Sequence, residues 1–187
     1  MTRIFLNAKE DKEISQGFPW VFDNEISHVK FENDKGEMIN APLMECSVSD
    51  GTIVEVCNKA GGFLGTGVLN KASKIAVRII SSEHADKIIG NEKSFIEKKI
   101  SDAVNIRRIY YSENDSYRLV FGEADFLPGL ICERYCTTDG EVYIVVQFLA
   151  MACNIFRTEI LDALKKIAKP DFIYDRIDEK ISEKEGL

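Results

Sequence analysis

The pattern of hydrophobic and polar positions changes in character after residue 82. Between Thr52 and Ser81, apolar and polar residues alternate in three runs, TIVEVCN, FLGTGVLN and KIAVRIIS, which the turn sequences AGG and NKAS separate. Such alternation is typical of half-buried strands, so it predicts a meander of three strands. A further strand is expected at 3–6, and the polar segment 31–51 is expected to be a loop with one short strand.

The second part of the chain combines helical and extended patterns. Ile96, Ile100, Ala103 and Val104 recur at spacings of three and four, which predicts an amphipathic helix after an N-cap at Asn91. A second helix is expected over roughly 151–168, ended by a Lys-Pro pair. Strands are predicted at SYRLVF, LICERY, EVYIVVQFL and DFIYDR.

These patterns predict an α+β protein with two domains. Residues 1–82 should form a small, mostly β pseudobarrel, in which glycines allow strands to bend. The GGFLGTG run fits neither the dinucleotide-binding nor the P-loop spacing, so its glycines are interpreted as structural. Residues 83–178 should form a mixed domain of strands and two helices, and residues 179–187 should start a linker.

Composition narrows the class of protein. Of the 187 residues, 45% are hydrophobic and 29% charged, as in soluble globular proteins. The amino-terminal residues lack the pattern of a signal peptide. The longest apolar run, 142–153, is well short of the roughly 20 residues needed to cross a bilayer. We therefore expect a cytoplasmic protein without membrane segments. The five cysteines show neither a disulfide framework nor zinc-ligand spacing, and the two histidines are distant, so no metal site is expected.

The formal net charge of -7 means that any surface for nucleic acid must be local. Lys71, Lys74 and Arg78 lie along one predicted turn and strand and are candidates for phosphate contacts, although such residues usually form a solvated face. Lys9 and Lys12 are further candidates. Trp20 fits either a core position or a platform for stacking bases.

Two carboxylates, Glu123 and Asp125, are two residues apart in the stretch NDSYRLVFGEADFLPGLICERY. On an extended strand they would share one face, which suits acid–base chemistry. No histidine, serine nucleophile or metal ligand accompanies them. The structural interpretation is that they bond turn amides near Pro128 and Gly129 and pair with Arg118 across a hairpin.

Four segments in order carry a resemblance to a known family: FPWVF, the block GTIVEVCNKAGGFLGTGVLNKASKIAVRI, DSYRLVFGEADFLPGLICERY and IYDRIDEKISEKEGL. The chain resembles the opening half of bacterial S-adenosylmethionine-dependent methyltransferases that modify cytosine C5 in 23S rRNA. The most specific elements are the Tyr117-Arg118-Leu motif, the Gly-Glu-x-Asp-x-Leu-Pro-Gly-Leu motif that includes Glu123, Asp125, Pro128 and Gly129, and the terminal Tyr-Asp-Arg and Glu-Gly.

The resemblance implies an RNA-binding PUA domain, then a noncatalytic central α+β domain, and a catalytic Rossmann-like domain beyond the residues of this chain. It implies that S-adenosylmethionine binds in that absent domain and not here, and that 23S rRNA is the partner. It also implies that Glu123 and Asp125 fix a hairpin or a domain interface.

Two other functions stay open at this stage: a free-standing PUA-type RNA-binding or ribosome-associated adaptor, and a small carboxylate enzyme that uses Glu123 and Asp125. The coding sequence after Leu187 would separate the adaptor from the methyltransferase. The carboxylate enzyme requires a pocket around the two acids. The sequence leaves open which nucleotide is modified, which side chains touch RNA, and whether the chain forms a homodimer.

Overall fold

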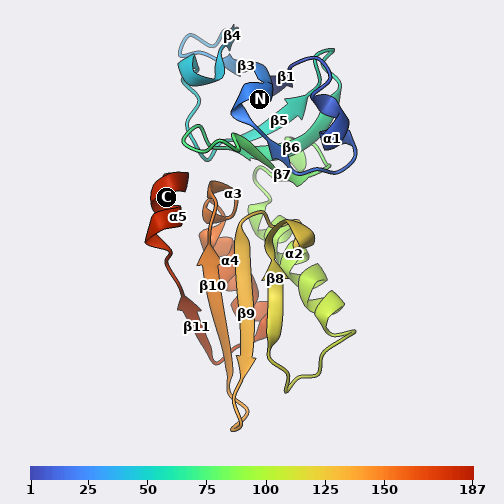
Figure 1. The fold of residues 1–187 in the computed structure, drawn as a ribbon, viewed down its shortest axis with the longest axis vertical. Helices are drawn as coiled ribbons and strands as arrows, with labels where there is room; N and C mark the ends of the chain where they lie inside the picture. Colours follow the sequence, from blue (N-terminus) through green and yellow to red (C-terminus); the bar gives the residue numbers. More distant parts are fainter. The chain divides into compact units, whose positions relative to one another are not determined.

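The computed structural model describes all residues from 1 to 187, and the chain folds into two compact units, which comprise mainly Met1–Ile89 and Gly90–Glu185. Each unit has its own sheet. The first is mostly β-structure and the second combines strands with helices (Figure 1). The predicted α+β class is therefore confirmed.

The first unit contains one sheet of seven strands: β1 (Arg3–Leu6), β2 (Trp20–Val21), β3 (Ile26–Glu32), β4 (Met38–Ala41), β5 (Ile53–Cys57), β6 (Phe63–Leu69) and β7 (Val77–Ser81). Its helical pieces are α1 (Asp11–Ser15) and the 3-10 turns η1 (Asp23–Glu25), η2 (Leu43–Glu45) and η3 (Ala85–Lys87). The strand order is β2-β7-β6-β5-β1-β3-β4. Strand β1 pairs parallel with β5, and all other neighbours are antiparallel.

The predicted meander is confirmed, since β5, β6 and β7 pair in succession, and β4 is the one short strand expected in the segment 31–51. Strand β3 was not predicted. Only Val29 and Phe31 of its seven residues are buried, so the alternation is too short to stand out in the sequence. In β2, Val21 is fully buried, whereas Trp20 is half-buried and so fits neither a pure core position nor a free surface position.

Strand β6 approaches β7 at a glycine. A Cβ atom at Gly67 would lie 2.5 Å from Cγ1 of Val77 and 2.7 Å from the carbonyl oxygen of Arg78. The β6–β7 register also shifts between Thr66 and Gly67. Only glycine permits such a close backbone approach. The glycine at this position is therefore structural, as the sequence predicted.

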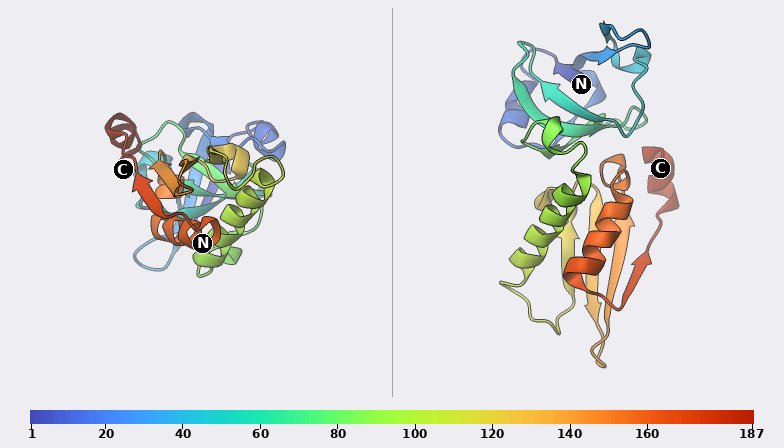
Figure 2. Two further views of the ribbon diagram at one scale, coloured as in Figure 1. Left: turned by 90° about the horizontal axis from the view of Figure 1, so that it is seen from below. Right: turned by 180° about the vertical axis from the view of Figure 1, so that it is seen from behind.

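The second unit contains β8 (Tyr117–Phe121), β9 (Leu130–Cys136), β10 (Val142–Phe148) and β11 (Phe172–Asp175), all near their predicted positions. Its helices are α2 (Glu92–Arg107), α3 (Met151–Asn154), α4 (Arg157–Ala163) and α5 (Glu179–Glu185), with the 3-10 turn η4 (Gly122–Asp125) and the π-helical turn η5 (Leu164–Ala168). The sheet order is β11-β10-β9-β8. Only β10 and β11 are parallel. Helices α2 and α4 lie on the same side of this sheet (Figure 2).

The two predicted helices differ in how well they match the structure. In α2 the four residues at helical spacing, Ile96, Ile100, Ala103 and Val104, are all buried. Asn91 occupies the N-cap position, although its side chain makes no capping hydrogen bond. The predicted helix over 151–168 is interrupted into α3, α4 and η5. At the interruption Phe156 turns into the core, and its ring lies 6.1 Å from the ring of Phe95.

The turn that Pro128 and Gly129 were expected to form is confirmed. The Leu130 amide donates to the Leu127 carbonyl at 3.0 Å, and Gly129 has a φ of 78°. Positive φ at the third position is typical of a type II turn with glycine. A Cβ atom at Gly129 would also lie 2.4 Å from Cβ of Ala150. Both observations require glycine at this position.

The conformation expected for Glu123 and Asp125 is wrong. Both residues lie in the 3-10 turn η4 and not on an extended strand. Side chains two positions apart in a helix with three residues per turn point in different directions, so the two carboxylates do not share a face. The arrangement that would have suited acid–base chemistry is absent.

The ion pair expected for Asp125 is also different. Asp125 does not pair with Arg118 but with Arg107 of α2, whose Nη1 and Nη2 donate to the two carboxylate oxygens at 2.6 Å each. Asp125 also accepts the amide of Phe121 at 2.6 Å. Arg118 pairs instead with Glu133 across the β8–β9 hairpin, with Nη2 at 2.8 Å from Oε1. The structural role predicted for Asp125 fits these contacts, with a different cation.

We predict that Asp125→Asn destabilises the second unit by about 3 kcal/mol, because removing one partner of a buried pair leaves the other charge uncompensated. The side chains of Asp125 and Arg107 are only 3% and 15% exposed. The measurement is a urea titration followed by the amide NMR signals of β8 and β9. Glu133→Gln is the matched control, because exposed pairs contribute at most about 1 kcal/mol. Equal losses of stability in the two variants would contradict the prediction.

Candidate nucleic-acid interface

One edge of the first sheet combines aromatic and cationic side chains. Trp20 of β2 and Arg78 of β7 are cross-strand partners, and the guanidinium carbon of Arg78 lies 5.8 Å from the Trp20 ring centroid. This distance is within the range of cation–π attraction. Phe18 packs edge-on against the Trp20 ring at 5.5 Å. With the exposed Lys74, these residues define what we call the β2–β7 edge: Phe18, Trp20, Lys74 and Arg78.

Lys71 and Lys74 lie in the turn before β7 but differ in their surroundings. The Lys74 carbonyl accepts the Asp23 amide at 3.0 Å, which ties this turn to the chain just after β2. The Lys74 side chain is exposed. Lys71 is half-buried, and its Nζ donates to the Cys46 carbonyl at 3.2 Å. Lys74 is therefore the better placed of the two for an external phosphate.

Lys9 and Lys12 lie at α1, whose Glu13 carbonyl accepts the amide of Phe18 at 3.0 Å. Lys12 is exposed on α1, and Lys9 is exposed in the turn before that helix, with a φ of 79°. Helix α1 packs against β6. The structure thus pairs Trp20 with Arg78 and ties the turn that carries Lys74 to the chain just after β2, whereas Lys9 and Lys12 lie at α1.

The β2–β7 edge has the chemistry of a nucleic-acid contact. The guanidinium group of Arg78 can donate several hydrogen bonds to phosphate oxygens, and the ammonium group of Lys74 adds a positive point charge. An indole ring provides a flat surface on which a base can stack. Trp20 is half-buried, so the fold holds one side of the ring while part of it stays accessible.

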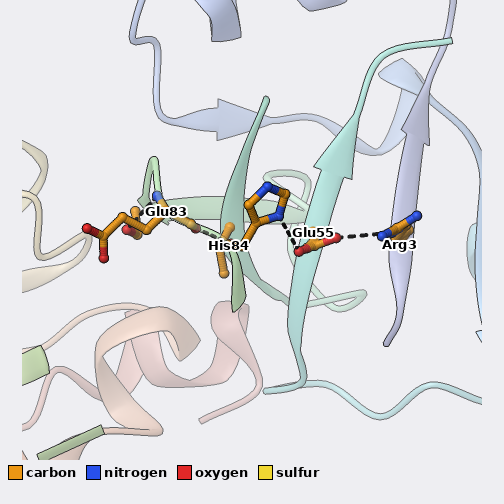
Figure 3. Close-up of polar contacts among 6 residues, drawn as sticks. Arg3, Glu55, Glu83 and His84 are labelled. Carbon is orange, nitrogen blue, oxygen red and sulfur yellow. Dashed lines mark hydrogen bonds and ion pairs between the residues drawn. The ribbon is translucent and has the colours of Figure 1, made fainter. Parts of the chain in front are cut away.

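A second polar cluster, which the sequence analysis missed, joins three segments of the first unit. Glu55 of β5 is 5% exposed and lies between Arg3 of β1 and His84, as Figure 3 shows. Arg3 Nε donates to Oε2 at 3.0 Å, and His84 Nδ1 lies 2.8 Å from Oε1. The Phe63 ring stacks on the imidazole, with 4.0 Å between centroids. The signal in the sequence was a carboxylate inside the apolar run IVEVC, which requires buried partners.

A cavity of about 410 Å³ lies beside this cluster and is lined by Glu55, Glu83, His84, Asp86 and Lys87. Three of these five residues are carboxylic acids, so the walls disfavour a phosphate. The same segment is held by hydrogen bonds: Thr66 Oγ1 donates to the Glu83 carbonyl at 2.7 Å, and the Glu83 amide donates to Ser81 Oγ at 3.0 Å. We interpret the cluster as a structural connection of η3 to the sheet.

Cys57, two residues after Glu55 on β5, does not complete a nucleophilic site with Glu55 and His84. Burial raises the pKa of the Cys57 thiol, which keeps it protonated at neutral pH. A protonated thiol is a weak nucleophile, so the arrangement does not favour cysteine chemistry.

The pKa of Glu55 reflects two opposing influences. Burial is the largest single one and raises the pKa, but the hydrogen bonds and charges of His84 and Arg3 together outweigh it, so the pKa of Glu55 in the folded state lies below its ordinary value. Between the folded and unfolded pKa values the unfolded state binds more protons, so stability falls as the pH falls. The stability that Glu55 contributes is fully present above the pKa of the unfolded state, and it is lost as the pH drops through the pKa of the folded state.

We therefore predict that Glu55→Gln makes the first unit less stable at pH 7 and weakens the loss of stability on acidification below about pH 4.5. The fluorescence of Trp20, the single tryptophan of the chain, reports on unfolding of this unit. Urea midpoints at a series of pH values provide the measurement. Parallel pH profiles for the variant and the unmodified chain would show that Glu55 does not contribute.

No helix of the chain is both long and apolar enough to cross a membrane, and no three His, Cys, Asp or Glu side chains are grouped so that they could hold a metal ion.

Comparison with known proteins identifies relatives of the whole chain and of its first part. Residues 4–82 match the family of PUA-like domains. Over 188 residues the chain is 26% identical to ribosomal RNA large subunit methyltransferase I of Tolumonas auensis, covering 100% of this chain and 42% of that protein. The protein of the same name from Erwinia tasmaniensis is 27% identical over 187 residues, covering 99% of this chain and 41% of the relative.

A solved structure from Streptococcus mutans, assigned as a SAM-dependent methyltransferase, superposes with a TM-score of 0.69 at 17% identity, over 95% of this chain and 41% of that protein. At this identity the likeness shows a common fold. The chain spans less than half the length of the curated relatives it matches. Residues 4–82 thus have a PUA-like fold, as predicted, and the chain is similar over its whole length to the N-terminal portion of these methyltransferases.

Proposed function

We propose that this chain is the RNA-recognition and positioning part of an S-adenosylmethionine-dependent methyltransferase that acts on cytosine C5 in 23S rRNA. The observation that carries the proposal is the alignment of the whole chain with part of ribosomal RNA large subunit methyltransferase I. The PUA-like fold of residues 4–82 supports a role in RNA binding. Two details of the proposal, cytosine C5 as the modified position and 23S rRNA as the substrate, are inferred from the family resemblance.

In this proposal the β2–β7 edge is the main RNA contact of the first unit. Arg78 and Lys74 contact backbone phosphates, which set the position of the RNA without reading its sequence. Trp20 stacks on an accessible base. Lys9 and Lys12 would extend the contact along the surface, whereas Lys71 is engaged with Cys46 and contributes less.

The methyl donor binds elsewhere in the full protein. S-adenosylmethionine supplies the methyl group, and these 187 residues contain no glycine loop of the kind that joins a strand to a helix around such a cofactor. The chain thus binds and orients RNA while another domain performs the transfer. The proposal places the protein in the cytoplasm and allows a homodimer.

We predict that the chain alone neither binds S-adenosylmethionine at micromolar concentrations nor transfers methyl groups to RNA, because its glycines serve turns and strand packing. Isothermal titration calorimetry with the isolated chain is the measurement. A saturable binding isotherm in the micromolar range would overturn the assignment of catalysis to another domain.

We also predict that the chain binds an rRNA hairpin weakly and in a salt-sensitive manner. Each phosphate contact contributes roughly 0.7 to 0.9 to the slope of log affinity against log salt. Lys74→Ala and Arg78→Ala should each flatten the slope by about this amount. Fluorescence anisotropy at several salt concentrations measures it.

Lys59→Ala is the matched control for this experiment, because Lys59 is exposed in the turn between β5 and β6 and lies outside the β2–β7 edge. Of these variants, Lys59→Ala should change the slope of log affinity against log salt least. If neither edge variant changes the slope while Lys9→Ala and Lys12→Ala do, the RNA contact lies at α1 and the assignment of the edge is wrong.

A further inference from the structure

The sheet of the second unit has one face without helices. Along β10, Ile144, Val146 and Phe148 are buried on the side of α2 and α4. The alternate residues, Tyr143 and Gln147 among them, lie on the opposite face, because successive side chains of a strand point to opposite sides. Figures 1 and 2 show no helix across that face.

Strand pairing places aromatic residues side by side on this open face. Tyr143 pairs with Tyr135 of β9 on one side and with Phe172 of β11 on the other, so three aromatic residues form one row. Two residues further along the strands, Val145 pairs with Tyr174. We define the aromatic face as Tyr135, Tyr143, Phe172 and Tyr174.

Most rings of the aromatic face are accessible, and contacts fix the orientation of Tyr135, Tyr143 and Phe172. The exposed fractions of Tyr135, Phe172 and Tyr174 are 45%, 51% and 65%. The Tyr143 ring stacks on Phe172, with 4.9 Å between centroids and 19° between planes. The hydroxyl of Tyr143 donates to Glu141 at 2.8 Å, and that of Tyr135 donates to Glu133 at 3.2 Å. Fixed orientation reduces the entropy lost when a ligand stacks on the rings.

Beyond the row of rings the same face carries two arginines and one acid, Glu133, whereas the acids Glu141 and Asp171 lie beside Tyr143. Glu133 pairs with Arg118, and the exposed Arg176 lies close enough to add to the attraction. The hydrogen bond from Arg118 is the main cause that lowers the pKa of Glu133. The guanidinium of Arg118 also lies 4.9 Å from the centroid of the Phe121 ring. Two guanidinium groups therefore lie near the Glu133 carboxylate.

We propose that the aromatic face binds unpaired nucleotides of a single-stranded RNA segment, with bases stacked on its rings and phosphates near Arg118 and Arg176. This rests on the proposed function and adds a second RNA surface to it. Bases in a duplex are already stacked on each other, so only unpaired ones can occupy such rings.

The composition of the face favours bases over an apolar protein segment. The aliphatic residues on the same side of the sheet, Ile131 and Val145, are both half-buried, so the accessible apolar surface there consists mainly of flat rings. A four-stranded sheet whose exposed aromatic residues stack on bases is the arrangement that RNA recognition motifs use.

The test uses the full chain and a single-stranded RNA of about ten nucleotides that carries one 2-aminopurine, a length within the range of single-stranded binding sites. Stacking of this fluorescent base on an aromatic ring quenches it. Tyr174→Leu and Phe172→Leu keep an apolar side chain and remove the ring. Each should weaken binding about 5- to 150-fold and reduce the quenching.

Tyr110→Leu is the matched control, because Tyr110 is 76% exposed just after α2 and lies outside the sheet. It should leave affinity and quenching unchanged. A fully paired duplex of the same sequence should bind the unmodified chain and both leucine variants equally. Unchanged affinity for the single strand in both leucine variants, with Arg78→Ala still weakening it, would overturn this proposal and leave the proposed function intact. The face would then be available to a protein partner. Absence of RNA binding by the unmodified chain would overturn both proposals.

Discussion

The buried ion pair between Arg107 and Asp125 determines how the second unit is assembled. Arg107 binds both carboxylate oxygens and donates through Nε to the Arg118 carbonyl, so the end of α2 is fixed to β8. Asp125 accepts the Phe121 amide at the end of β8. Helix, strand and turn therefore meet at one charged contact. The next residues form the Leu127–Leu130 turn and start β9, so the pairing of β8 with β9 depends on this geometry.

The first unit depends on a comparable buried carboxylate. Glu55 connects β1 to the segment before η3, through partners 52 positions earlier and 29 positions later. Throughout the chain no buried side-chain nitrogen or oxygen lacks a hydrogen-bond partner. This completeness matters because an unpaired buried polar group costs about 1 to 3 kcal/mol. In both units a buried acid thus joins a strand of the sheet to a helix or loop next to it.

Local patterns in the sequence predicted the elements whose identity depends on neighbouring residues. Helix α2, the β5–β7 meander and the four strands of the second unit follow from periodicity, and the turn at Gly129 follows from its residue types. Interactions over long distances in sequence could not be predicted in this way. The parallel pairing of β1 with β5 joins residues about 50 positions apart. The partner of Asp125 was assigned to the nearby Arg118, whereas the helix geometry brings Arg107 to it.

The candidate sites likewise combine features that nearby residues predict with features that only long-range strand pairing creates. Lys74 and Arg78 were recognised because they are close in sequence, but their association with Trp20 arises only when β2 pairs with β7. The aromatic face was not recognised at all. Its residues come from three strands, and in β10 the run VYIVV is apolar enough to suggest burial on both sides. The register of the folded sheet, and not any single motif, places Tyr135, Tyr143 and Phe172 in one row.

The net charge of -7 limits how this chain can hold a polyanion. Charges more than about 8 Å away are largely screened at physiological salt, so the few cations of the β2–β7 edge act locally while distant acids contribute little. Two or three phosphate contacts give weak binding that salt removes easily. Stacking on rings is not driven by release of counterions and retains more of its strength as salt increases. Under the two proposals, an acidic chain that combines a cationic edge with an aromatic face binds RNA although its net charge alone predicts repulsion. It would also favour unpaired regions, because the salt-resistant part of the binding is available only to accessible bases.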